Sequence, residues 1–140
     1  MTNLEMARSN LRQAGRILDE AVHHAQGEAW HLVVRRCQET VELALKATLR
    51  VAGIEVPHVH DVGMFLRDHA ERFPASLAKH LDRVVSISRR LRQEREISFY
   101  GDEEVGAPPD RLYTSEDADE ALRDARFVLE LSEGCVPPQR

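Results

Sequence analysis

The chain is poor in aromatic residues and has no long apolar run, and each shortage disfavours a class of protein. Aromatics make up 5% of its 140 residues, and β-branched residues are outnumbered by Ala, Leu, Glu and Arg. This composition suits helices better than sheets. No apolar run approaches the roughly 18 residues that a membrane span needs. The N-terminal residues carry charges without an apolar segment, so we expect no signal peptide.

Cysteine, lysine and net positive charge are also scarce. Cys37 and Cys135, the two cysteines, lack the spacing of a metal site, and we read them as reduced thiols of a cytoplasmic protein. The net charge of −5 disfavours nucleic-acid binding through bulk positive charge. Only Lys46 and Lys79 among the 19 basic residues are Lys. Arg suits phosphate recognition, but a GC-rich genome produces the same bias, and both explanations stay open.

Four long segments carry apolar residues at steps of three and four, the period of a helix that buries one face. They predict helices over residues 3–26, 30–52 and 75–98, and from Thr114 to near 131. A short helix is predicted after Asp61, as its N-cap, and before Pro74. The stretches 53–59 and 100–113 read as loops. We therefore predict an all-α, up-and-down bundle of four long helices plus one short helix. Residues 1–132 form one domain, and 133–140 form a flexible tail.

Arg95 is the first candidate for a functional side chain. It falls on the apolar seam of the helix predicted over 75–98, where a buried guanidinium needs partners. One interpretation is an anion site in which Arg95 holds a phosphate with help from Arg92 or Arg89. The other is that the seam ends here and Arg95 points outward near the helix C-terminus, where a cation is favourable.

His58, His60 and Asp61 form the second candidate, because three such side chains within four residues can bind a metal. A metal site needs a third or fourth ligand of defined geometry, and the sequence offers no obvious one. The alternative is that His60 and Asp61 simply start the short helix. We therefore expect no metal, and no cofactor. Neither Ser nor Cys stands in a nucleophile motif, and the seven glycines are scattered rather than gathered in a phosphate loop.

Two runs of the sequence together resemble the HEPN domain family over about residues 5–132. The first half contains Gln38-x-x-x-Glu42-x-x-Leu45-Lys46, followed by Pro57-His-Val-His60-Asp61. It is similar to the helix motif QxxxExxLK and the loop that follows it in that family. The second half reads Arg95-Glu-Ile-Ser-Phe-Tyr100-Gly-Asp-Glu, then Pro109 and Tyr113-Thr-Ser-Glu-Asp-Ala118. It resembles a prokaryotic branch with the pattern RxxxFYGDE…P…YT…DA.

The resemblance implies a helical domain that forms a homodimer and partners a minimal nucleotidyltransferase, in a two-component or toxin–antitoxin pair. It assigns Lys46, His60 and Asp61 to the structural motif. Other HEPN branches are metal-independent RNases with an Arg-x4–6-His motif, whose Arg corresponds to Arg95. The positions four to seven after Arg95 are Phe99, Tyr100, Gly101 and Asp102, and no His follows His80. The proton-transfer group of those RNases is therefore missing.

Two functions remain open from the sequence. The first is a non-catalytic, dimeric binding module, in which Arg95, Tyr100 and Arg92 hold a nucleotide or RNA phosphate. The second is a ribonuclease toxin of atypical motif, with Arg95 and Tyr100 as its catalytic residues. The missing His favours the first, since a phenol with a pKa near 10 is a poor general acid–base at neutral pH.

Overall fold

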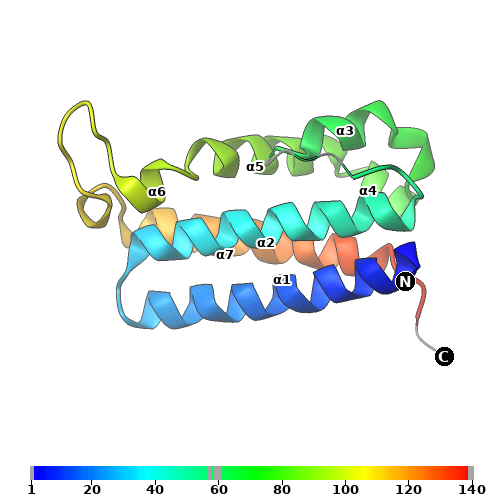
Figure 1. The fold of residues 1–140 in the computed structure, drawn as a ribbon, viewed down its shortest axis with the longest axis horizontal. Helices are drawn as coiled ribbons and strands as arrows, with labels where there is room; N and C mark the ends of the chain where they lie inside the picture. The colour runs from blue at the N-terminus through cyan, green and yellow to red at the C-terminus, as the bar shows by residue number, and fades with distance from the viewer. Residues whose placement is uncertain (1, 57, 59–60, 139–140) are drawn as a thin grey trace.

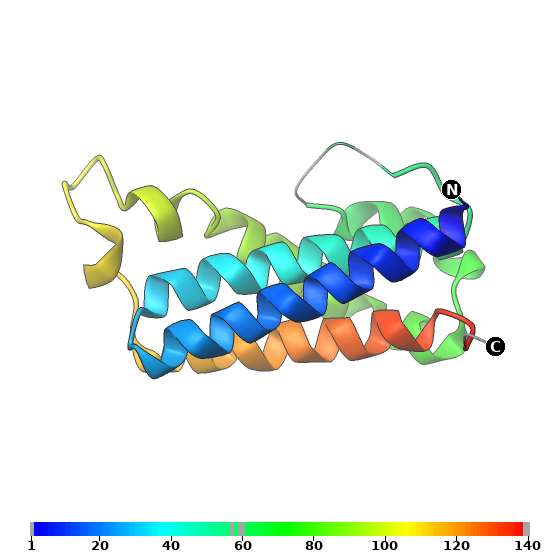
Figure 2. The ribbon, with the colours of Figure 1, turned by 60° about the horizontal axis from the view of Figure 1, so that its bottom comes forward.

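The chain folds as an all-α bundle, as the sequence predicts. A computed structural model describes residues 2–56, 58 and 61–138. The helices are α1 (Asn3–Gln26), α2 (Trp30–Val51), α3 (Gly63–Asp68), α4 (Ala75–Ala78), α5 (Leu81–Gln93), α6 (Ile97–Tyr100) and α7 (Ser115–Gly134), with 3-10 turns η1 (Ala70–Arg72) and η2 (Pro109–Arg111). Helices α1, α2 and α7 lie along one another, and α5 lies on the other side of α2 from α1 (Figures 1 and 2). None of the described helices is both long enough and apolar enough to cross a membrane.

The ends of the long helices follow the expected local signals. Helix α7 starts with a capping box, in which the Thr114 Oγ1 accepts from the backbone of Asp117 and the Asp117 carboxylate accepts from the backbone of Thr114. Helix α2 ends at Val51, and Gly53, two residues further on, has a φ of +73° that suits glycine. The N–H groups of Gly53 and Ile54 donate to the carbonyls of Arg50 and Leu49, which closes the helix with a Schellman motif.

The helix predicted over 75–98 is divided into α4, α5 and α6. At the first division, the N–H of His80 donates to Leu77, three residues back, and the φ of His80 is −110°. This backbone places the His80 ring edge-on against Phe127 of α7, with the centroids 5.3 Å apart. Apolar period alone does not reveal such a division, because the apolar residues on both sides still face the same core.

The prediction that Asp61 caps the short helix is wrong. The N-cap of α3 is Val62, and no side chain caps it. Asp61 instead accepts a hydrogen bond from the Ser88 hydroxyl at 3.0 Å, and the Ser88 oxygen accepts from the backbone N–H of Gly63 at 3.3 Å. A Cβ on Gly63 would lie 3.1 Å from the Cα of Val85, so glycine lets α3 start directly on α5. His60 lies outside the described residues.

The core is continuous through the bundle, and α2 contributes more buried apolar side chains to it than any other helix. Leu45 and Leu49 of α2 are fully buried, as are Leu66, Leu77 and Ile87 of the neighbouring elements. Cys37 is buried among them, and burial raises the pKa of its thiol to about 12. Because the thiolate is the reactive form, Cys37 is a packing residue at neutral pH.

Candidate functional site

Arg95 lies in a turn where the helical hydrogen-bond pattern breaks. Helix α5 ends at Gln93 and α6 begins at Ile97. In a continuous helix the N–H of Phe99 would donate to the carbonyl of Arg95, but it donates to Glu96 instead. The freed carbonyl of Arg95 accepts from the Ser98 hydroxyl at 3.2 Å and from Nη1 of Arg35 on α2. This turn is therefore fixed by a side chain from another helix.

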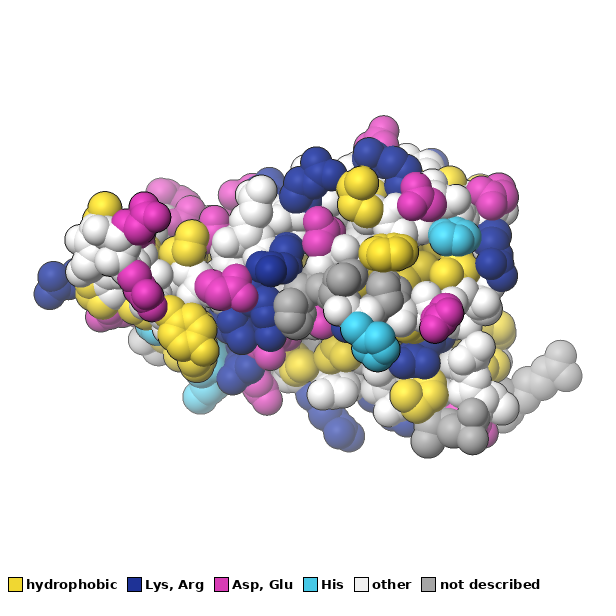
Figure 3. All heavy atoms as spheres, turned by 45° about the horizontal axis from the view of Figure 1, so that its top comes forward, with side chains coloured by type: hydrophobic (Ala, Val, Ile, Leu, Met, Phe, Trp, Pro, Cys, Tyr) yellow, Lys and Arg dark blue, Asp and Glu magenta, His cyan; other side chains and the backbone are white. Residues whose placement is uncertain are grey.

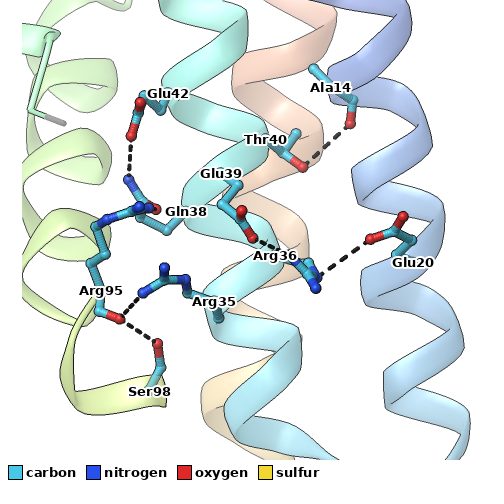
Figure 4. A network of polar contacts seen from close by, with 10 residues as sticks. All are labelled: Ala14, Glu20, Arg35, Arg36, Gln38, Glu39, Thr40, Glu42, Arg95 and Ser98. Atoms are coloured by element: carbon cyan, nitrogen blue, oxygen red, sulfur yellow. Dashed lines mark hydrogen bonds and ion pairs between the residues drawn. The ribbon is translucent and has the colours of Figure 1, made fainter. Parts of the chain in front are cut away.

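The side chain of Arg95 is held by Gln38, the first residue of the QxxxExxLK motif (Figure 4). Its Nη1 donates to Oε1 of Gln38 at 2.7 Å. Gln38 is only 2% exposed, and its Nε2 donates to Oε1 of Glu42 at 3.0 Å. The other carboxylate oxygen of Glu42 accepts from Nζ of Lys46 at 3.0 Å. Gln38, Glu42 and Lys46 are four residues apart, so they share one face of α2, and the motif forms a polar ladder that leads to Arg95.

Arg35 belongs to the same site, and the sequence analysis missed it. Besides its bond to the Arg95 carbonyl, its guanidinium lies over the ring of Phe99, 5.0 Å from the centroid. Burial and then the charge of Arg95 lower the pKa of Arg35. Arg35 precedes Gln38 by three residues, and this spacing could have placed it on the motif face.

Two exposed aromatic rings complete the site, which we call the Arg35–Arg95 cluster: Arg35, Arg95, Phe99 and Tyr100. Phe99 is 48% exposed and Tyr100 63%, and their rings meet edge to face at 5.1 Å. Among the described residues, no carboxylate is in ion-pair range of either arginine of the cluster. Lys and Arg side chains gather in the middle of this face of the molecule, beside hydrophobic side chains toward the α6 end (Figure 3).

The other predicted site residues lie in different surroundings. Arg92 forms an ion pair with Glu96, four residues further on, at 3.1 Å. Arg89 contacts the Met64 sulfur at 3.0 Å. Within the part of the chain that the structure describes, no three His, Cys, Asp or Glu residues are placed to hold a metal ion. His58 is exposed.

Glu94, the residue before Arg95, fixes the loop that follows α6. Its Oε2 accepts a hydrogen bond from the Tyr113 hydroxyl at 2.5 Å. Burial, and then this hydrogen bond and the charge of Glu94, raise the pKa of Tyr113. The neighbouring residues Glu94 and Arg95 thus tie the same turn to two different parts of the fold.

The raised pKa of Tyr113 predicts how the protein responds to alkali. A tyrosine in the unfolded chain releases its proton at about pH 10, whereas Tyr113 in the folded protein still retains its proton at that pH. This contribution to stability is therefore complete below about pH 10 and is lost as the pH rises further. At about pH 11, we expect the wild type and Tyr113→Phe to show equal tyrosinate absorbance while their circular dichroism stays native. Extra tyrosinate signal in a natively folded wild type would contradict the assignment.

Comparisons with known proteins agree with this architecture. The HEPN domain profile matches residues 7–135. The crystal structure of an archaeal HEPN homologue superposes with a TM-score of 0.72 at 26% sequence identity, over 94% of this chain and 98% of that one. Among curated proteins, none matches the sequence significantly. With the family profile spanning nearly the whole helical bundle, including the α2 ladder and the turn at Arg95, the chain belongs to the HEPN domain family.

Proposed function

We propose that this HEPN domain is a non-catalytic binding module that holds phosphate groups of a nucleotide or RNA at the Arg35–Arg95 cluster. The observation that carries the proposal is the proximity of two guanidiniums that form no ion pair with a described carboxylate. Guanidinium forks bind phosphate oxygens through paired, charge-assisted hydrogen bonds. The exposed rings of Phe99 and Tyr100 supply surfaces on which bases stack.

The chemistry of the cluster supports binding rather than cleavage. General acid–base catalysis needs a group that exchanges protons near neutral pH, and no His follows His80 in the sequence. Arginine has donor groups and no acceptor atom, so the two arginines can bind and orient an anion but cannot act as a general base. A ribonuclease toxin remains the alternative, and the experiment below distinguishes the two.

A homodimer is part of the same proposal. Ile97, Phe99, Tyr100 and Val105 are large apolar or aromatic side chains that are 39–73% exposed on α6 and the loop after it. Such groups on a small domain are typical of a surface that meets a partner. HEPN domains commonly dimerise, and a two-fold axis through this surface would bring two Arg35–Arg95 clusters together. Partnership with a minimal nucleotidyltransferase rests on the RxxxFYGDE resemblance.

Sedimentation velocity with a short, fluorescently labelled single-stranded RNA tests binding and dimerisation together. We expect the free wild-type protein to sediment as a dimer of twice the 15.9 kDa chain mass, and to bind the RNA. Arg35→Gln and Arg95→Gln should each weaken binding by about tenfold or more, because each removes a charge-assisted contact. Arg16→Gln is the control, because it removes the same charge from an exposed position on α1, away from the cluster. It should leave the affinity within about twofold of the wild type.

Each part of the proposal has its own contradictory result. Equal affinity in Arg35→Gln, Arg95→Gln and Arg16→Gln would exclude the cluster as the binding site. A wild type that sediments only as a monomer at micromolar concentration would exclude the dimer. Cleavage of the RNA by the wild type and its loss in Arg95→Gln would establish the ribonuclease instead.

A further inference from the structure

A pocket of about 410 Å³ lies between α5, α6, α7 and the loop after α6, and it includes Glu94 but not Arg95 among its lining residues. Its volume falls within the range of small-molecule sites. Part of its wall is apolar and comes from three helices: Val34 of α2, Leu91 of α5 and Ala121 of α7. The pocket is therefore a concave surface with an apolar part, and none of the four residues of the Arg35–Arg95 cluster lines it.

The polar part of the wall is strongly acidic. Arg90 is the one cationic residue of the lining, and it bridges Glu120 at 2.9 Å and Asp124 at 2.6 Å. Three further carboxylates have no cation partner among the described residues, namely those of Glu94, Asp102 and Asp117. The lining thus combines five carboxylates with apolar side chains and a single guanidinium.

The three unpaired carboxylates accept hydrogen bonds only from neutral donors in the described part of the chain. Glu94 accepts from the Tyr113 hydroxyl, and Asp102 accepts from the backbone N–H groups of Glu104 and Val105. Asp117 accepts from Thr114 at the start of α7. Neutral donors hold these side chains in place and, unlike a cation, bring no charge that opposes a carboxylate's. An ionised carboxylate offers about four acceptor positions, so each retains capacity for a cationic donor.

We propose that this pocket binds an aliphatic diamine or polyamine. The carboxylates come from the turn after α5, the loop after α6, and α7, and no three of the described acidic residues are close enough together to hold a metal ion. Separated carboxylates around an apolar wall match ammonium groups separated by methylenes. The ammonium groups pair with the carboxylates, and the methylenes cover the apolar residues. The proposal does not depend on nucleotide or RNA binding at the Arg35–Arg95 cluster.

Calorimetry on the full chain tests the ligand class with matched probes. We expect 1,5-diaminopentane and spermidine to bind, spermidine more tightly because it carries one more charge. The neutral analogue 1,5-pentanediol has the same carbon chain and should not bind detectably. Equal heats for the diol and the diamine would overturn the proposal, because recognition would then not involve the ammonium groups. Equal binding of Mg²⁺ and diamine would also overturn it, because the effect would then be general charge neutralisation.

Matched variants test the place of binding. Glu94→Gln and Asp102→Asn each remove a charge from the lining and keep an oxygen that accepts the present hydrogen bonds. Each should weaken diamine binding by about threefold to tenfold, and the two together by more. Asp119→Asn removes one charge from an exposed position on α7 outside the lining and should not change affinity. Equal losses in Asp119→Asn and Glu94→Gln, with unchanged thermal melts, would exclude the pocket.

Discussion

Replacing Gly101 with alanine should lower the free energy of unfolding by about 2–4 kcal/mol. Gly101 has φ +80° and ψ −173°, a conformation that is essentially restricted to glycine. A Cβ at this position would lie 2.3 Å from the carbonyl oxygen of Ala107. That oxygen cannot move freely, because it accepts from the N–H of Asp102 at 2.9 Å, and the N–H of Ala107 donates back to Asp102 at 3.0 Å.

Gly106→Ala is the matched control for Gly101→Ala. Gly106 also has a positive φ, of +67°, but a Cβ there would meet no atom within 4 Å. This variant should therefore show only the backbone cost of a left-handed alanine, about 1 kcal/mol. Urea unfolding followed by circular dichroism measures both. Equal stability of the two variants would show that the contact with Ala107 does not determine the loop.

Gly101→Ala should also disturb the geometry of the Arg35–Arg95 cluster. Gly101 directly follows Phe99 and Tyr100, and its N–H donates to the carbonyl of Ile97, which ends α6. A displaced backbone at Gly101 would shift both rings away from Arg35. We therefore expect RNA binding to fall in Gly101→Ala and to be retained in Gly106→Ala.

Signals that act over a few residues were reliable guides to the fold. The apolar period predicted α1 and α2 with their observed bounds or nearly so, and the Thr114–Asp117 spacing predicted the start of α7. Helix α7 runs to Gly134, a little past its predicted end. These features depend on neighbouring residues, so a single sequence contains the information that determines them.

Features that depend on distant residues were missed. At the division between α5 and α6, the carbonyl of Arg95 accepts a hydrogen bond from Arg35, which lies 60 residues earlier in the chain. Asp61 pairs with Ser88, 27 residues away, and does not cap the adjacent helix. Arg95 was identified from its place on an apolar seam, but its partner Gln38 comes from another helix. Tertiary contacts decided each of these cases, and local propensity does not include them.

The contact between Arg95 and Gln38 predicts the second large effect. Judged only by its position near a helix end, Arg95 would contribute little to the free energy of unfolding. However, Arg95→Ala leaves Oε1 of Gln38 without its donor, and Gln38 is 2% exposed. A buried acceptor that loses its partner costs about 1–3 kcal/mol. We therefore expect Arg95→Ala to lower the free energy of unfolding by that amount, measured by urea denaturation.

A double-mutant cycle isolates this contact. Gln38→Leu removes the buried acceptor, so adding Arg95→Ala to it should cost about 1–2 kcal/mol less than in the wild type. Thr40→Val provides the control cycle, because Thr40 is buried on the α1 side of α2, where its hydroxyl donates to the Ala14 carbonyl at 3.3 Å (Figure 4). With no partner in common, Thr40→Val and Arg95→Ala should add to within about 0.5 kcal/mol. Additivity in both cycles would show that Gln38 does not hold Arg95, and the α2 ladder would then have no part in positioning the site.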